Sequence, residues 1–153
     1  MKTVLISGGT GLVGTRLSQK LKEKGYQVNI LSRSKKNDSE FKTFFWDVNK
    51  HFIDPEAIET ANYIIHLAGA NIAEKRWTDE RKKEILDSRV KSGDLLFNAV
   101  KSIPNQLKAF ISASAVGYYG AITTQHIFSE SDPSHDDFLG KTCALWEASA
   151  NQF

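Results

Sequence analysis

Cysteine is almost absent from this sequence, and so are long apolar runs and a strong excess of either charge. A single thiol, Cys143, cannot close an intramolecular disulfide or complete a structural zinc site, which favours a reducing compartment and makes the cytoplasm the expected location. No apolar run approaches the roughly 20 residues that span a bilayer. Lys and Arg outnumber Asp and Glu by only 20 to 18, so the chain lacks the broad basic field of nucleic-acid-binding proteins. We therefore expect neither a membrane segment nor nucleic-acid binding.

Metal-ligand spacing is missing as well. The histidines form no helical His-x-x-x-His pair and have no cysteine partner; they are His51, His66, His126 and His135. We therefore predict no metal site. His66 ends a predicted strand and is interpreted as a structural residue.

What the sequence does contain is the alternation of short apolar runs with longer amphipathic ones, over a length suited to one domain of 153 residues. This alternation is typical of strand–helix units that build a parallel sheet. Five strands are predicted, and their near-continuous apolarity indicates burial on both faces: Lys2–Ser7, Gln27–Leu31, Phe41–Trp46, Tyr63–Leu67 and Leu107–Ser112. The fold class is therefore α/β, with a doubly wound parallel sheet in the order 3-2-1-4-5 of these strands.

Three helices are predicted between and after these strands, over Leu12–Lys24, Asp79–Lys101 and Asp137 to the end. Lysines in the last turn of the first helix, followed by Gly25, predict a left-handed C-terminal cap. Gly93 lies on the apolar stripe of the second helix and should allow close approach of a neighbouring helix. Thr123–Asp137 is rich in Ser, Asp and Pro and is predicted to be irregular.

A glycine-rich turn follows the first strand and opens the first helix. Its pattern is Gly8-x-x-Gly11-x-x-Gly14, with Thr10, Leu12 and Val13 between the glycines. Glycines in this position let backbone N–H groups approach a pyrophosphate at the positive end of a helix. The turn predicts a dinucleotide site, the alternative being a tight turn without a ligand.

The residues after the second strand indicate which dinucleotide binds. An NAD site would carry an acid there for the ribose diol, whereas this chain has Ser32 and Arg33, followed by Lys35 and Lys36. A hydroxyl and cations suit the 2′-phosphate of NADP, and Arg33 can bond it with paired N–H groups. The alternative is a solvated basic loop. Asp47, after the third strand, is a candidate for the adenine amino group or a simple turn former.

Several segments together resemble one family, the atypical extended short-chain dehydrogenases of the nucleoside-diphosphate-sugar epimerase type, some of which are called cell-division-inhibitor homologues. The resemblance covers the whole chain and rests on residues 10–14, 66–72, 76–78, 88–90, 112–120, 137–139 and 146–147. It implies a Rossmann domain that binds NADP, with Leu67, Ala68 and Gly69 among the cofactor-binding residues. It also implies a small carbonyl substrate, for instance a nucleotide sugar, and a second substrate domain.

Members of that family are about twice as long as this chain. Residues 1–153 are therefore expected to be the NADP-binding Rossmann domain. We expect this domain to be the N-terminal part of a longer protein whose C-terminal substrate domain is missing here. A cut at Phe153 should leave one sheet edge and Trp146, Leu145 or Phe153 exposed. We accordingly expect self-association.

The resemblance also points to a departure in the catalytic residues. Active enzymes of the wider superfamily carry a Tyr-x-x-x-Lys pair on the helix after the fifth strand. Counting from Glu147, the tyrosine position holds Leu139 and the lysine position holds Cys143. Cys143 is interpreted as a small buried hydrophobe rather than a nucleophile.

The remaining catalytic candidates lie after the fifth strand. Ser114, with Ser112 as its alternate, is at the position resembling the superfamily's substrate-orienting serine, and Tyr118 or Tyr119 could donate a proton. The alternative for both tyrosines is a packing role. Arg89 resembles the position of a conventional asparagine, the alternative being a helix-face salt bridge.

Two functions remain open from the sequence. The first is an NADP-dependent oxidoreductase or epimerase in which Ser114 and Tyr118 replace the missing pair. The second is a module that senses NADP without turnover. Retention of the serine–tyrosine segment favours the enzyme, and loss of Tyr-x-x-x-Lys favours the sensor.

Overall fold

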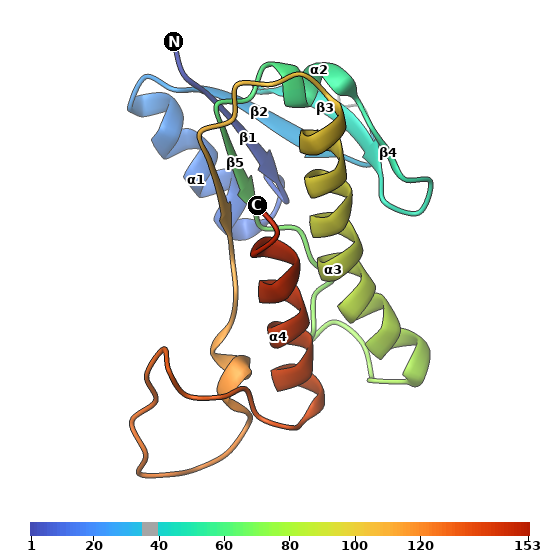
Figure 1. Ribbon diagram of the computed structural model, residues 1–153, viewed down its shortest axis with the longest axis vertical. Coiled ribbons are helices and arrows are strands. Elements are labelled where there is room, and N and C mark those ends of the chain that lie inside the picture. Colours follow the sequence, from blue (N-terminus) through green and yellow to red (C-terminus); the bar gives the residue numbers. More distant parts are fainter. Residues whose placement is uncertain (35–39) are drawn as a thin grey trace.

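The central feature of the molecule is one six-stranded sheet, seen in a computed structural model that describes residues 1–34 and 40–153 (Figure 1). Its order is β4-β3-β2-β1-β5-β6, and only the β3–β4 pair is antiparallel. The strands are β1 Thr3–Ser7, β2 Gln27–Ser32, β3 Lys42–Asp47, β4 Phe52–Ile53, β5 Tyr63–His66 and β6 Ala109–Ser112. The five parallel strands follow the predicted order 3-2-1-4-5, with chain reversal between β1 and β5, which is the Rossmann topology.

The short segment after β3 differs from the prediction. β4 pairs Trp46 with Ile53 at the sheet edge, and the helix α2, Pro55–Glu59, follows at once. Asp54 begins that helix by accepting a hydrogen bond from the Glu56 backbone N–H at 3.1 Å, with Pro55 in the first turn. A strand of two residues is too short to show an alternation of apolar and polar side chains, so the sequence pattern could not reveal it.

The three long helices agree with the predictions to within a few residues. They are α1 Leu12–Glu23, α3 Asp79–Ser102 and α4 Phe138–Ala150. Thr78 and Asp137 cap α3 and α4 through their side chains. Gly25 has a φ of 81°, and the Tyr26 N–H bonds Leu21 O at 3.0 Å, so the predicted left-handed cap is confirmed.

The connection between β6 and α4 is long and mostly irregular. A single turn of 3-10 helix, η1 Val116–Tyr119, follows β6. Residues 120–137 then contain neither helix nor strand, which confirms the prediction for Thr123–Asp137. Across the described ranges, none of the helices is both long and apolar enough to cross a membrane.

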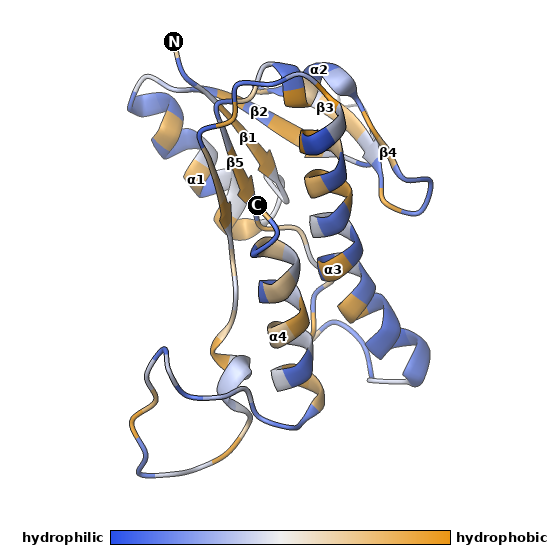
Figure 2. Ribbon diagram, in the orientation of Figure 1, coloured by the Kyte–Doolittle hydropathy of each residue, from blue (hydrophilic) through white to orange (hydrophobic). Residues whose placement is uncertain are grey.

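Helices cover both faces of the sheet. On one face Val4, Ile6 and Val28 pack with Leu17 and Leu21 of α1. On the other face the larger core forms, with side chains from β1, β2, β3, β5, α2 and α3. Figure 2 shows the hydrophobic colouring concentrated on the strands and on the helix faces that point to them. Burial of these apolar side chains is the main force that holds the layers together.

Helix α4 packs mainly against α3 and also contacts β6 at the edge of the sheet (Figure 1). The close approach occurs at Gly93, where a Cβ atom would overlap Oγ of Ser149. The predicted role of Gly93 is therefore confirmed. Ser149 in turn donates to Asp94 Oδ1 at 2.8 Å.

Strand β6 departs from the predicted burial on both faces. Ile111 is 51% exposed, because α1 covers only the strands nearer the middle of the sheet. Leu145 and Phe153 are also exposed, at 49% and 41%. Trp146, in contrast, is buried and packs under the guanidinium of Arg89, so Leu145 and Phe153 are the exposed members of the predicted set.

Candidate functional site

The predicted site residues converge at the carboxyl edge of the sheet. Strand register places the end of β1, Ser7, beside Leu31 of β2 and His66 of β5, while His66 lies beside Ser112 of β6. The loops that follow these strands therefore leave from one edge. That edge lies at the topological switch point, where open α/β sheets bind ligands.

The glycine turn after β1 is tight enough to exclude side chains. Gly8 has a φ of 74°, and a Cβ there would lie 2.9 Å from the Ala68 nitrogen of the neighbouring loop. A Cβ on Gly14 would overlap Gly8 O and lie 2.6 Å from the Gly9 Cα. The absence of side chains brings α1 directly onto the turn. This cradle fits the backbone approach that a pyrophosphate requires.

The first turn of α1 is open at its N-terminus. Gly11 caps it without a side-chain hydrogen bond, and no acidic residue occurs in the first turn. Leu12 and Val13 are 92% and 65% exposed. The first backbone N–H groups of a helix have no partner within the helix, so this end favours an anion.

The predicted 2′-phosphate residues follow β2. Ser32 ends the strand, and its Oγ accepts from the Ser34 N–H at 3.2 Å. Arg33 is exposed and forms no ion pair within the described part of the chain. Lys35 and Lys36 lie outside the described residues.

Asp47 has a clear local role after β3. Its Oδ1 accepts from the backbone N–H groups of Asn49 and Lys50 at 3.0 and 3.1 Å. The carboxylate therefore holds the turn into β4, which is the alternative that the sequence left open. A contact between Asp47 and an adenine amino group stays a prediction.

His66 links three elements beneath the edge, a connection that the sequence did not reveal. Its Nδ1 lies 2.6 Å from Oγ of Ser7, and its Nε2 lies 3.2 Å from Oγ of Ser92. All three side chains are buried. Burial lowers the pKa of His66 from 6.5 to about 4, so the ring is neutral near pH 7.

Hydrogen-bond directions in this network follow from the neutral ring. Ser92 Oγ donates to Ser88 O at 2.6 Å, so it accepts from Nε2–H of His66. Nδ1 then accepts from the Ser7 hydroxyl. Ser7 Oγ in turn accepts from the Ala68 N–H at 3.4 Å. The network thereby ties the predicted cofactor segment 67–69 to β1 and α3.

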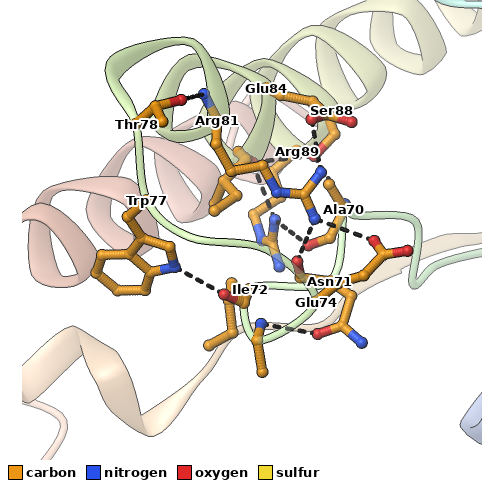
Figure 3. Close-up of polar contacts among 12 residues, drawn as sticks. Ala70, Asn71, Ile72, Glu74, Trp77, Thr78, Arg81, Glu84, Ser88 and Arg89 are labelled. Atoms are coloured by element: carbon orange, nitrogen blue, oxygen red, sulfur yellow. Dashed lines mark hydrogen bonds and ion pairs between the residues drawn. The ribbon is translucent and has the colours of Figure 1, made fainter.

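The loop 70–78 is attached to α3 by polar contacts (Figure 3). Arg81 is 6% exposed and bonds Asn71 O and the carboxylates of Glu74 and Glu84. Trp77 donates from Nε1 to Ile72 O at 2.7 Å. Its ring also meets Phe138 of α4 at 5.3 Å between centroids. These contacts attach the loop to both α3 and α4.

Arg89 is not the salt-bridged helix residue of the alternative interpretation. Its Nη1 donates to Ala70 O at 3.1 Å and to Ile85 O at 2.9 Å, and no carboxylate within the described ranges lies within 4.0 Å. The guanidinium lies over the Trp146 ring at 5.1 Å. Desolvation by burial lowers the pKa of Arg89 from its usual range.

The catalytic candidates lie after β6 at the same edge. Ser114 is exposed and donates from Oγ to Oε1 of Glu147 on α4. Ser112 Oγ donates to Ala113 O at 2.9 Å, which leaves Ser114 as the serine that points at an ionisable group. The carboxylate partner was not predicted, because the two residues are far apart in sequence.

The two tyrosines of η1 differ in their hydroxyl partners. Tyr119 donates to Ser129 O at 3.1 Å, and desolvation followed by the negative charge of Glu130 raises its pKa. Among the described residues, no hydrogen-bond partner is found for the Tyr118 hydroxyl. Tyr118 is therefore the phenol free to meet a ligand.

The positions of the missing pair are apolar in the structure. Cys143 is buried, and burial raises the pKa of its thiol, so it is neutral near pH 7 and packs as a small hydrophobe. Leu139 lies against Gly117: a Cβ atom added at position 117 would be 3.4 Å from the Cβ of Leu139. Neither position supplies the phenol or the ammonium group of the usual pair. Within the described ranges, no group of three His, Cys, Asp or Glu side chains could hold a metal ion.

The topology and the glycine cradle define this chain as a Rossmann-fold domain. It belongs to the NAD dependent epimerase/dehydratase family, whose profile matches residues 4–142. An epimerase family protein from Arabidopsis thaliana, the chloroplastic SDR39U1 homologue, is 32% identical over 97% of this chain and 44% of its own length. An epimerase family protein from Mycobacterium tuberculosis is 33% identical over 94% of this chain and 46% of its own. The chain thus spans about half the length of these relatives.

Solved structures agree with this assignment. Human epimerase family protein SDR39U1, determined with NADPH, has a TM-score of 0.81 and 30% identity over 97% of this chain and 48% of that one. A nucleoside-diphosphate sugar epimerase from Corynebacterium glutamicum has the same TM-score and 34% identity over 99% of this chain and 30% of its own. The predicted family resemblance and the predicted Rossmann fold are confirmed.

Proposed function

We propose that this chain is the NADP-binding part of an NADP-dependent oxidoreductase or epimerase that acts on a nucleotide sugar or another small carbonyl substrate. The observation that carries the proposal is the pairing of two features at one edge, the glycine cradle and the exposed Arg33 beside Ser32. Family membership supports it, and the human relative was crystallised with NADPH.

Specific residues would hold the cofactor. The N-terminus of α1, with Gly11, Leu12 and Val13, would accept the pyrophosphate because the first N–H groups of a helix have no partner within the helix and because Leu12 and Val13 are exposed. Ser32 and Arg33 would bind the 2′-phosphate. The segment 67–69 would line the middle of the site. When bound, NADP supplies or accepts the hydride.

Proton transfer would then depend on the serine–tyrosine segment. Ser114 Oγ, whose proton is donated to Glu147, would orient a substrate hydroxyl by accepting its hydrogen bond. Tyr118 would move a proton at the reacting oxygen, since its own hydroxyl has no partner in the described chain. Glu147 accepts from Ser114 and would keep that hydroxyl in a fixed rotamer. Both roles are part of the proposal.

A specific observation favours the second candidate, a sensor that binds NADP without turnover. Leu139 and the neutral thiol of Cys143 occupy the positions where the superfamily's acid–base pair is expected. The sensor would use the same cofactor site. The two candidates therefore differ in catalysis and agree in binding.

The location and extent of the protein are also proposals. The low cysteine content supports the cytoplasm. We propose that residues 1–153 correspond to the N-terminal, cofactor-binding half of proteins such as the relatives described above, with the substrate-binding half elsewhere.

A two-stage experiment tests the proposal. Calorimetry first compares NADPH with NADH, and we expect tighter binding of NADPH. Loss of the reduced nicotinamide absorbance is then followed with NADPH and a panel of carbonyl compounds, and its gain is followed with NADP⁺ and UDP-glucose, using residues 1–153 and the product of the full gene. We expect turnover only with the latter, and its loss in Tyr118→Phe. Binding of NADPH with no turnover by either form would favour the sensor, and equal affinity for NADH would contradict the NADP assignment.

A further inference from the structure

Two arginines on α3 lie side by side against the loop 70–78, and they differ in how their charges are balanced (Figure 3). Arg81 meets Glu84 at 2.5 Å and Glu74 at 3.2 Å. Arg89 meets no carboxylate in the described part of the chain, although burial penalises its charge. A desolvated cation without a counter-charge is costly unless a ligand supplies one.

The guanidinium of Arg89 is held in a fixed position. Nη1 bonds two carbonyl oxygens, and one face of the group rests on Trp146. The group also touches Gly69, where a Cβ would lie 3.0 Å from Arg89 Cζ. A side chain at position 69 would therefore displace the guanidinium. This anchoring limits the entropy that ligand binding would have to remove.

The remaining edge of the guanidinium is available. The hydrogen bonds of Arg89 within the described ranges all involve Nη1. Nε and Nη2 have no partner in the described ranges, and neither atom is fully buried. Both are therefore accessible. These two nitrogens form the planar, two-donor edge that matches a carboxylate.

The surroundings place Arg89 next to the proposed substrate region. Arg89 lies against Gly69, and its charge interacts with the Cys143 thiol. The same thiol interacts with the backbone of Ala115, the residue after Ser114. Arg89 and the Ser114 segment therefore both lie near Cys143. The proposed phosphate sites are elsewhere, at the N-terminus of α1 and after β2.

We propose that Arg89 is a substrate-binding residue that holds a carboxylate, so that the substrate class is a carboxylate-bearing sugar or carbonyl compound. This inference rests on the proposed function, because it assigns part of the same site. The carboxylate would supply the counter-charge that Arg89 lacks and would accept from Nε and Nη2 together.

Matched sugar nucleotides test the assignment. Calorimetry would measure the binding of UDP-glucuronate and of UDP-glucose to the product of the full gene, saturated with NADP. The two ligands differ only in a carboxylate that replaces a hydroxymethyl group. We expect UDP-glucuronate to bind roughly 10- to 100-fold more tightly, the range for charge-assisted hydrogen bonds. Arg89→Gln should abolish that ratio, and Arg89→Lys should retain only part of it because lysine lacks the two-donor edge. Lys83→Gln, which removes an exposed charge from the same helix, should leave the ratio unchanged.

A second measurement avoids dependence on variant folding. The Nε–H resonance of Arg89 in the unsubstituted protein should shift saturably with glucuronate and stay in place with glucose. Equal affinities for the two sugar nucleotides, or an equal loss of both in Arg89→Gln, would overturn the assignment of Arg89 alone. Failure of the unsubstituted protein to bind NADPH would instead overturn the proposed function.

Discussion

The imidazole of His66 and the hydroxyl of Ser7 join β5 to β1 through a hydrogen bond of 2.6 Å, and the bond requires a ring that accepts at Nδ1. Protonation of His66 would turn that acceptor into a second donor and place a charge in a buried site. The stability of the sheet edge should therefore depend on pH.

We expect the free energy of unfolding to fall as the pH falls from about 6.5 to about 4. The pKa of His66 is about 4 when folded and 6.5 when exposed, so in this window the unfolded chain binds the proton first. The contribution of neutral His66 to stability is fully present above the unfolded pKa of 6.5 and is lost progressively as the pH falls toward the folded pKa of about 4. The loss between about pH 7 and about pH 5 should be about 2 kcal/mol. Urea unfolding at the two pH values measures it.

The matched variants for this prediction are His66→Gln and His126→Gln. His66→Gln should be less stable at neutral pH but should lack most of this pH dependence. His126 is exposed, so its replacement should retain the slope. A slope unchanged in His66→Gln would contradict the assignment to this ring.

Arg33 should discriminate between the two dinucleotides. Arg33→Ala should weaken NADPH binding by about 1.5–3 kcal/mol, the range for a hydrogen bond to a charged group, and leave NADH nearly unchanged. Calorimetric titration with both nucleotides measures the difference. Lys20→Ala, an exposed charge on α1, serves as the control for general electrostatics. A parallel loss for NADH would show that Arg33 does not bind the 2′-phosphate.

Gly93 should be intolerant of a methyl group because Ser149 of α4 occupies the space. Gly93→Ala should destabilise the fold by about 1–3 kcal/mol, and Gly93→Ala with Ser149→Ala should lose less than the sum of the single losses. Urea unfolding of the four proteins gives the coupling. Asn98→Ala, at an exposed position of the same helix, should change stability little. If the losses in the free energy of unfolding of the two single variants simply add, the proposed contact between positions 93 and 149 would be contradicted.

Exposed apolar side chains on β6 and α4 predict self-association. Ile111 and Leu145 are about half exposed, and Phe153 stacks on Phe110 with centroids 3.7 Å apart at the surface. We expect sedimentation velocity to show dimers or larger species that increase with concentration. Ile111→Thr with Leu145→Gln should shift the distribution to the monomer. A monomer at every concentration would contradict the prediction.

The sequence predicted elements whose signals are local. The glycines at 8, 14 and 25 mark their own turns, and the apolar runs of the five parallel strands are long enough to recognise. Contacts between distant segments were not predictable in this way. Glu147 meets Ser114 across 33 positions, and nothing in the periodicity of α4 indicates that Trp146 is covered by Arg89. Asp47 shows the remaining difficulty, since one carboxylate can form a turn or bind a ligand.

The two edges of the sheet differ in their capacity to recruit another strand. β4 is only two residues long, runs antiparallel, and is followed by Pro55, whose nitrogen cannot donate a hydrogen bond. That edge is a poor template for backbone pairing. β6 has four residues, no strand on its outer side in the described chain, and Ile111 exposed. Any strand added to this sheet, from the same chain or from another molecule, should therefore join at β6, and growth of the sheet has a single direction.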